Sequence, residues 1–270
     1  WRVAFMVAGA PGIVFALIAA FTLVEPRKKL AAEMAARASS QISFAAALAV
    51  LATKKTFWLV ALAASVKAFI GYGHAPFTAS FFFRVHGTEI AALAGEFGLK
   101  SAGFLGLALG LIGGTAGVIG AWLGGVFADR LGAKDLRAYV TVPAIASLIT
   151  IPIFVIAMSL EAPMVAISLL AINALLGTLW YGPVYATAQS IVDPALRATA
   201  SAVLLLIINL IGLGLGPLAV GLLSDILAGP MGLGEAQGVR WALIISAGLG
   251  LVAFGLFWAA RKTIREEMVS

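Results

Sequence analysis

The stretch Gly124-Gly-Val-Phe-Ala-Asp-Arg-Leu-Gly-Ala-Lys-Asp-Leu-Arg137 decides the fold, because it places a dense polar cluster directly after an apolar run. Its glycines permit a sharp turn and a close approach of the backbone. Charged side chains cannot enter hydrocarbon cheaply, and this stretch carries several, among them Asp129, Arg130, Lys134 and Arg137. The stretch therefore predicts a tight loop between two membrane helices, at the membrane surface.

The composition is that of a membrane protein. Hydrophobic residues make up 62% of the 270 residues and charged residues only 11%, whereas soluble proteins carry about 25% charged residues. The net charge of +6 is spread over loops rather than gathered on one face, so no nucleic-acid partner is expected. The chain has no cysteine, which excludes disulfide and thiol chemistry within it.

Seven apolar segments are long enough to cross a bilayer, whose hydrocarbon core of about 30 Å needs about 20 helical residues. They cover residues 3 to 24, 57 to 83, 103 to 127, 139 to 160, 163 to 189, 199 to 227 and 240 to 260. The sequence therefore predicts an all-α membrane protein with seven transmembrane helices. An odd number of spans puts the two ends of this sequence on opposite sides of the membrane.

The basic residues predict the orientation. If residue 1 lies outside, the inner loops hold 13 of the 18 Lys and Arg residues and the outer loops hold four. The positive-inside rule then places residues 27 to 56 and 261 to 270 in the cytoplasm. The chain does not begin with Met, and Trp1-Arg2 stands at the outer mouth of an apolar helix, so we expect further helices upstream.

The spacing G-x-x-x-D-R-x-G-x-K-x-x-R resembles the signature loop of the major facilitator superfamily, which recurs between the second and third helices of each six-helix half. An ordinary basic loop would explain the cationic residues but not the two glycines that frame Asp-Arg. In the family this motif lies at the cytoplasmic rim. The resemblance therefore implies a gate formed by Gly125, Asp129, Arg130, Gly132, Lys134 and Arg137.

The resemblance assigns the seven spans to helices 6 to 12 of a 12-helix transporter. Residues 1–26 would be helix 6, the last helix of the N-terminal half, and residues 27–56 the cytoplasmic linker between the halves. Residues 57–260 would be the C-terminal six-helix bundle and 261–270 a cytoplasmic tail. Within the linker, residues 42 to 51 are apolar but too short to span, which predicts an amphipathic helix lying on the surface.

The second span is the least apolar of the seven, and Gly71, Gly73 and Pro76 loosen its middle. Such residues are tolerated at membrane depth where the backbone lines a cavity or packs on protein. The end of this span, Phe81-Phe-Phe-Arg-Val-His-Gly87, resembles the seventh helix of spinster-like transporters. That branch is associated with the export of lysolipids and sphingolipids.

Three polar residues are predicted at the bilayer midplane: Lys67, Asn173 and Asn209. Each stands ten residues from the expected start of its span, about 15 Å deep at 1.5 Å per residue. A Lys at a helix centre costs about 2.5 to 3.5 kcal/mol, so these side chains should face the protein interior or water. For the two asparagines, hydrogen bonds between helices are as consistent with the sequence as contact with a substrate.

One face of the second span forms a polar stripe, because Lys67, Gly71, His74 and Thr78 stand at i, i+4, i+7 and i+11. We expect this stripe to face a central cavity, where Lys67 attracts an anionic head group. His74 would add pH sensitivity near neutrality. The alternative is that Lys67 pairs with a carboxylate from helices outside this sequence.

Aromatic residues complete the candidate cavity. The fifth span places Asn173, Gly177 and Tyr181 at i, i+4 and i+8, with Trp180 beside them. Packing in the core, or anchoring at the membrane interface, would explain Trp180 and Tyr181 as well. Tyr72, between two glycines of the second span, is open to either interpretation.

The remaining spans carry packing signals. Small residues at every fourth position of the third span predict close helix contact, and they are Gly106, Gly110, Gly114 and, offset, Gly113, Gly117, Ala121 and Gly125. The glycines and Pro217 of the sixth span predict a bend. The fourth and seventh spans have no charged residue within the bilayer and are predicted to face lipid.

The resemblance implies a secondary active transporter that moves an amphiphilic or anionic organic solute across a bacterial inner membrane by alternating access. No nucleotide-binding domain is visible in the sequence, so we expect a proton gradient to drive transport. Expected partners are that solute, protons, membrane lipids and the N-terminal helices of the same protein. Zinc-ligand spacing and phosphate-loop endings are absent from the sequence, so neither metal nor cofactor nor catalytic residues are expected.

Two rival functions fit less of the sequence. A drug or organic-anion transporter of another branch would share the same fold and gate motif. A membrane enzyme or scaffold would need buried carboxylate or histidine pairs, or a large folded loop, and this sequence shows neither.

Overall fold

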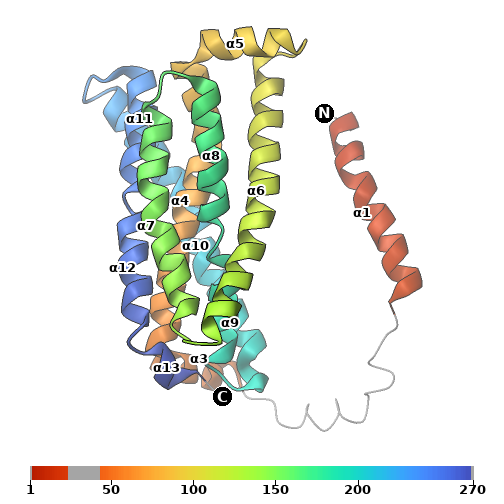
Figure 1. Ribbon diagram of the computed structural model, residues 1–270, viewed down its shortest axis with the longest axis vertical. Helices are drawn as coiled ribbons and strands as arrows, with labels where there is room; N and C mark the ends of the chain where they lie inside the picture. The colour runs from red at the N-terminus through yellow and green to blue at the C-terminus, as the bar shows by residue number, and fades with distance from the viewer. Residues whose placement is uncertain (1, 24–42, 269–270) are drawn as a thin grey trace. The chain divides into compact units, whose positions relative to one another are not determined.

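The computed structural model describes residues 2–23 and 43–268, and within these ranges every regular element is a helix (Figure 1). Seven helical stretches are long and apolar enough to cross a membrane: Phe5–Thr22, Lys55–Val85, Ser101–Gly132, Ala138–Ser159, Pro163–Ser190, Pro194–Ala228 and Gly234–Ala260. The prediction of an all-α membrane protein with seven spans is confirmed. The seven spans lie close to the predicted ranges.

The chain divides into two units, residues 1–43 and 44–270. The first unit contains α1 (Arg2–Thr22), an apolar helix with Pro11 inside it. Most of the predicted linker lies outside the described residues. Its apolar end forms α3 (Phe44–Thr53), which belongs to the second unit and buries Ala47 and Leu51 in the core of the bundle.

The second unit is a helical bundle. Its further elements, in chain order, are α4 (Lys55–Val85), α5 (Gly87–Glu96), α6 (Ser101–Gly132), α7 (Ala138–Ser159), α8 (Pro163–Gly177), α9 (Tyr181–Ser190), the 3-10 turn η1 (Pro194–Leu196), α10 (Arg197–Ala228), α11 (Gly234–Ala247), α12 (Gly250–Ala260) and α13 (Ile264–Glu267).

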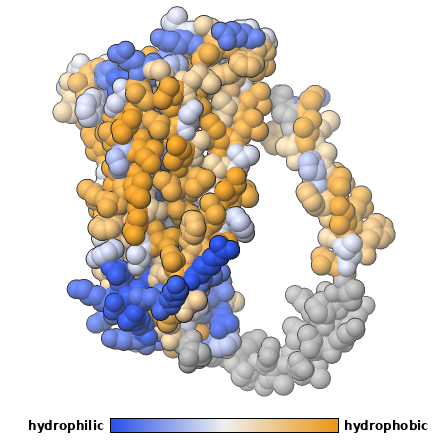
Figure 2. Space-filling view, viewed as in Figure 1, coloured by the Kyte–Doolittle hydropathy of each residue, from blue (hydrophilic) through white to orange (hydrophobic). Residues whose placement is uncertain are grey.

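The two ends of the bundle are polar and the belt between them is apolar (Figure 2). At one end, here called the motif end, lie the loop 133–137 between α6 and α7 together with α3 and α13 (Figure 1). At the other, the α5 end, α5 crosses the bundle (Figure 1). This distribution is what hydrocarbon requires, because polar groups are costly within it and cheap at its surfaces.

Two predicted spans are each built from two helices. The fifth breaks at residues 178–180, between α8 and α9, and the seventh at residues 248–249, between α11 and α12. Helical breaks are tolerated at membrane depth where protein surrounds the freed backbone groups. The first of these breaks shapes the candidate site below.

The contact between α4 and α10 is the most extensive in the bundle. Gly216 lies against the backbone of Phe69 and Gly73, and Gly212 lies against Ala68, so a Cβ atom at either glycine would collide with α4. The glycines of the sixth span therefore provide close packing. The helix α10 runs without a break through Pro217, and the bend that the sequence predicts there stays a prediction.

The tightest glycine contacts of α6 lie outside the two predicted stripes. Gly120 and Gly124 lie directly against the backbone carbonyls of Leu175 and Leu179, at the break after α8. Five glycines of the predicted stripes have open space where a Cβ would stand, within the described residues: Gly106, Gly110, Gly113, Gly114 and Gly125. A Cβ at Gly182 of α9 would still meet the backbone of Gly125, so part of the offset stripe lies in a close helix contact.

The last residues of the chain are partly folded onto the bundle. The predicted tail begins at residue 261, yet Ile264 of α13 is fully buried in the core cluster of the motif end, which also contains Phe57 and Phe257. Residues 261–268 are therefore part of the packed structure.

Candidate functional site

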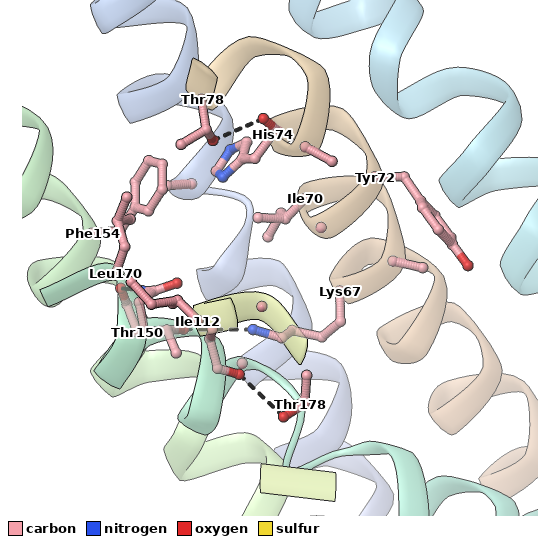
Figure 3. A pocket seen from close by; sticks show the side chains of 18 of the residues that line it. Lys67, Ile70, Tyr72, His74, Thr78, Ile112, Thr150, Phe154, Leu170 and Thr178 are labelled. Atoms are coloured by element: carbon pink, nitrogen blue, oxygen red, sulfur yellow. Dashed lines mark hydrogen bonds between the residues drawn. The ribbon is translucent and has the colours of Figure 1, made fainter. Parts of the chain in front are cut away.

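A cavity of about 530 Å³ opens in the middle of the bundle, between α4, α6, α7 and the break that joins α8 to α9 (Figure 3). The sequence-predicted residues that line it are Lys67, Tyr72, His74, Thr78, Asn173, Trp180 and Tyr181. Gly71, the fourth member of the polar stripe, lines it as well. Apolar side chains such as Ile112, Phe154 and Leu170 form much of the remaining wall.

Lys67 is the buried cation of this cavity. Only 7% of the residue is exposed, and its Nζ lies 3.5 Å from the Thr150 hydroxyl, a long contact for a hydrogen bond. The ion pairs among the described residues join Arg84 to Glu235 and Arg265 to Asp135. Within the described part of the chain, Lys67 therefore has a single weak polar contact and no carboxylate in ion-pair distance.

His74 lies two helical turns from Lys67 on the same face of α4 (Figure 3). Its Nε2 is 2.9 Å from the Ser246 hydroxyl, and its ring stacks on Phe154 with ring centroids 4.4 Å apart. The backbone carbonyl of His74 accepts a hydrogen bond from Thr78 at 2.9 Å. Neighbours on α7 and α11 thus hold the imidazole in one orientation.

Thr150 of α7 connects the lysine to a second predicted residue. Its hydroxyl is the contact of Lys67, and its backbone carbonyl accepts a hydrogen bond of 2.8 Å from the Asn173 amide. Asn173 therefore bridges α8 to α7 while it lines the cavity. The bridging role considered for it is present in the structure, and its contact with a substrate stays a prediction.

The aromatic residues predicted for the site differ in their positions: two of them stack on each other, and the third leaves α4 on another side. Trp180 and Tyr181 stack with ring centroids 4.0 Å apart, and Trp180 is 3% exposed, so it packs in the core while it contributes to the cavity wall. Tyr72 leaves α4 on a different side from Lys67 and His74 (Figure 3).

Asn209 does not line the cavity. Its amide donates a 2.8 Å hydrogen bond to the Leu205 carbonyl, one turn back along α10. The depth of this residue along its helix matched that of Lys67. No residue of α10 lines the cavity, because this helix packs on the face of α4 that carries Ala68 and Gly73.

The fourth and seventh spans were predicted to face lipid, and the structure corrects this. Thr150, Ile151 and Phe154 of α7 line the cavity, and Ser246 and Ala247 of α11 contact or line it. The prediction failed because it relied on charged residues, whereas these helices contribute hydroxyl and aromatic groups. A serine or threonine in an apolar helix usually bonds to its own backbone, so its sequence signal is weak.

Two glycines allow close contacts at the gate motif. Gly182 of α9 lies against the backbone of Gly125, which a Cβ at Gly182 would meet at 3.1 Å, and Gly132 leaves room for the ring of Tyr139, which a Cβ would meet at 2.6 Å. The Tyr139 hydroxyl donates a 2.8 Å hydrogen bond to the Asp129 carboxylate. Asp129 thus has a partner on α7, next to its own loop.

The cationic residues of the motif differ in their surroundings. Arg130 and Lys134 are exposed, while Arg137 is half-buried and donates its backbone N–H to Asp135 at 2.9 Å. Asp135 also contacts Arg265, at 3.0 Å from Nη2. The backbone N–H of Arg137 and then Arg265 hold the pKa of the Asp135 carboxyl below its usual range. Sequence reasoning did not single out Asp135, because its partner lies in the C-terminal segment.

The cavity combines one basic side chain with largely apolar walls. Lys67 is buried there, with hydroxyl and amide groups beside it and aromatic rings in the wall. Within residues 2–23 and 43–268 no cluster of three or more His, Cys, Asp or Glu side chains suits a metal ion.

Comparison with known proteins agrees with this architecture. The sequence pattern that defines the Major Facilitator Superfamily matches residues 1–217. An MFS-type efflux pump of Mycolicibacterium smegmatis is 30% identical over 269 residues, which cover 100% of this chain and 58% of the pump.

Two crystal structures of a bacterial homologue of the human lysosomal transporter Spinster are similar to the whole chain. The inward-facing, unoccupied structure has a TM-score of 0.75 at 27% identity, and the inward-facing, occupied one has 0.68 at 25%. The chain covers 60% and 59% of those two proteins, so it spans well under two thirds of each relative. The chain belongs to the major facilitator superfamily and is similar to its spinster-like branch.

Proposed function

We propose that this chain forms the substrate-binding C-terminal half, with helix 6, of a secondary active transporter that moves an amphiphilic or anionic organic solute. The observation that carries the proposal is Lys67, a buried cation that faces a cavity and has no acidic partner among the described residues. A charge in such a place is costly, and a functional counter-ion offsets that cost.

The chemistry of the cavity supports an amphiphile. Lys67 offers an ammonium group to an anionic head group, while Ile112, Phe154 and Leu170 offer apolar surface to a hydrocarbon part. A lysolipid- or sphingolipid-like solute combines these two features. The similarity to a Spinster homologue and to an efflux pump supports outward movement of such solutes.

The transport cycle that we propose is alternating access. Residues 57–260 would rock against an N-terminal half around a site at the bilayer midplane, with residues 27–56 as the linker between the halves and protons as the driving ions. The N-terminal helices of the same protein are then the main partner of this chain. The exposed apolar residues of α6, such as Leu111, Val118 and Trp122, suit lipid or such a partner.

We further propose that the protein lies in a bacterial inner membrane with the motif end in the cytoplasm. The excess of Lys and Arg residues in the loops at that end supports this orientation. A bacterial relative supports the compartment.

The relative from Mycolicibacterium smegmatis supports a second candidate, an efflux pump for drugs or other organic anions. The two candidates differ in the solute and share the site. A membrane enzyme would need a reactive pair of side chains, and Lys67 and His74 contact hydroxyl groups instead.

Transport by the full-length protein in liposomes tests the proposal. Lys67→Ala should lower the uptake of a lysolipid with an anionic head group about tenfold or more, since a charge-assisted contact contributes about 1.5–3 kcal/mol. The same substitution should lower the uptake of a neutral lipid of the same chain length much less. Full transport of the anionic lipid by a folded Lys67→Ala protein would show that this charge does not bind substrate.

Two further variants control for folding. Lys67→Arg keeps the charge and should keep part of the transport. Lys100→Ala removes an exposed lysine outside the cavity, at the α5 end, and should change nothing. If Lys67→Ala unfolds the protein and Lys67→Met does not, transport by the methionine variant decides the question.

A further inference from the structure

Two hydroxyl groups determine which polar atoms the cavity presents. Thr150 of α7 and Ser246 of α11 each have one hydroxyl hydrogen, and each donates it within its own helix. Thr150 bonds to the Ser147 carbonyl at 2.9 Å, and Ser246 bonds to the Ala242 carbonyl at 2.7 Å. Both oxygens can then only accept hydrogen bonds from the cavity side.

The partner of Ser246 is the imidazole of His74, at 2.9 Å from Nε2. The bond of Ser246 to its own helix leaves its oxygen free to accept, which favours the tautomer with the hydrogen on Nε2. In a neutral imidazole one nitrogen donates and the other accepts, so Nδ1 is left with a free lone pair. Within the described residues Nδ1 has no hydrogen-bond partner, and His74 lines the cavity.

Lys67 offers hydrogen-bond donors to the cavity, whereas His74 offers an acceptor. The Thr150 oxygen accepts from its Nζ over a long 3.5 Å, so the ammonium group still has donors to offer. Lys67 and His74 are seven residues apart on α4, which places them about 10 Å apart along the helix at 1.5 Å per residue. The stripe thus presents a cationic donor and, two turns away, a neutral acceptor.

We propose that the cavity recognises a solute at two points: an anionic group at Lys67, and a hydroxyl or ammonium donor about 10 Å away that bonds to Nδ1 of His74. Ser246 is the positioning residue that sets the tautomer of His74. This inference rests on the proposed function, because it names a second feature of the solute that Lys67 binds. A solute with the anion alone makes no hydrogen bond to this acceptor, and it therefore binds less tightly.

The tautomer itself is testable without any solute. Nitrogen-15 spectra of the full-length protein with labelled histidine, assigned by the signal lost in His74→Phe, should show Nε2 protonated and Nδ1 bare. Ser246→Ala should shift this signal toward a mixture of tautomers. Ser159→Ala removes a serine of α7 that also bonds to its own helix but lies outside the cavity, and it should leave the spectrum unchanged. An Nδ1-protonated ring in the wild-type protein would overturn the proposal.

Binding tests the second recognition point. The probes are an ω-hydroxyalkyl phosphate, whose chain places the hydroxyl about 10 Å from the phosphate as the helix spacing requires, and its methyl ether, which cannot donate. The wild-type protein should bind the alcohol about tenfold more tightly, as expected for one buried hydrogen bond. His74→Phe and Ser246→Ala should reduce this preference, whereas Ser159→Ala should keep it.

The two proposals can fail separately. The wild-type protein could bind the alcohol and the methyl ether equally well, while Lys67→Ala binds neither of them. This result would overturn the second recognition point and support the anion site. If the wild-type protein binds neither probe, the proposed function fails for this solute class, and the nitrogen-15 spectra still decide whether His74 presents an acceptor.

Discussion

Arg265 and Asp135 join two segments that are 130 residues apart in the sequence. The guanidinium Nη2 lies 3.0 Å and its Nε 3.2 Å from the same Oδ1 atom of Asp135. That oxygen also accepts the backbone N–H of Arg137. The loop of the gate motif is therefore tied to the C-terminal segment at the motif end.

This contact predicts a dependence of stability on pH. The folded pKa of Asp135 lies below its unfolded value, chiefly because of the Arg137 N–H and then Arg265. A depressed folded pKa stabilises the fold above the unfolded carboxyl pKa of about 3.9, and this contribution is lost as the pH falls through the folded pKa.

Asp135→Asn should therefore lose less stability than the wild-type protein during acidification from about pH 5 to pH 3. Thermal unfolding in detergent over that range measures the difference. Because both side chains are substantially exposed, high salt should shrink it. Parallel acid curves for the two proteins would contradict the assignment.

A second prediction concerns Glu267, which caps the start of α4. Its two carboxylate oxygens each accept a backbone N–H, from Lys55 and from Thr56, at 3.0 Å. Lys54 at the N-cap position makes no side-chain cap. A carboxylate at a helix N-terminus satisfies orphan N–H groups and the helix dipole, so Glu267→Ala should destabilise the protein by about 1 to 2 kcal/mol.

Glu266→Ala provides the matched control, because Glu266 is the exposed neighbour on the same short helix. It should change the free energy of unfolding by less than about 0.5 kcal/mol. Equal effects of the two substitutions would mean that the helix cap contributes nothing specific.

A third prediction concerns the close contact of α6 with the break after α8. A Cβ at residue 124 would collide with the carbonyl of Leu179, so Gly124→Ala should cost about 1 to 3 kcal/mol through overpacking. Gly255 of α12 has open space around it, and Gly255→Ala should be neutral or should stabilise its helix by up to about 1 kcal/mol. Thermal unfolding of both variants tests the register, and a harmless Gly124→Ala would argue against it.

The proposed orientation yields a fourth prediction. The chain has no cysteine, so single cysteines can report exposure once any others in the full-length protein are removed. Glu266→Cys at the motif end should react with a membrane-impermeant maleimide only after the cells are opened. Glu96→Cys on α5 should react in intact cells. The reverse pattern would invert the topology.

The membrane spans could be predicted from the sequence because the cost of placing a segment in hydrocarbon depends on the residues of that segment alone. An apolar run of sufficient length must form a helix, whatever its neighbours are. The polar stripe of Lys67, His74 and Thr78 could be predicted for a related reason, since the helical period alone puts these residues on one face. The structure places all three at the cavity.

The cross-helix partners could not be predicted in this way. Asn209 and Asn173 have the same depth and side chain, yet only Asn173 reaches the cavity, because the packing of the bundle decides which helices surround it. Thr150 and Ser246 carried no signal within apolar spans, and their roles depend on which side chains of α4 come to lie opposite them.

By itself the sequence determined where the chain enters and leaves the membrane, which helix carries the buried charge and which loop carries the gate motif. Those properties depend on the cost of placing each segment in hydrocarbon and on the period of one helix. Only the tertiary structure decided that Gly120 and Gly124 pack on the break after α8, that Ser246 orients His74, and that Glu267 caps α4 from 212 residues away. Such contacts require the relative rotation and height of separate helices, and packing across the whole bundle sets both.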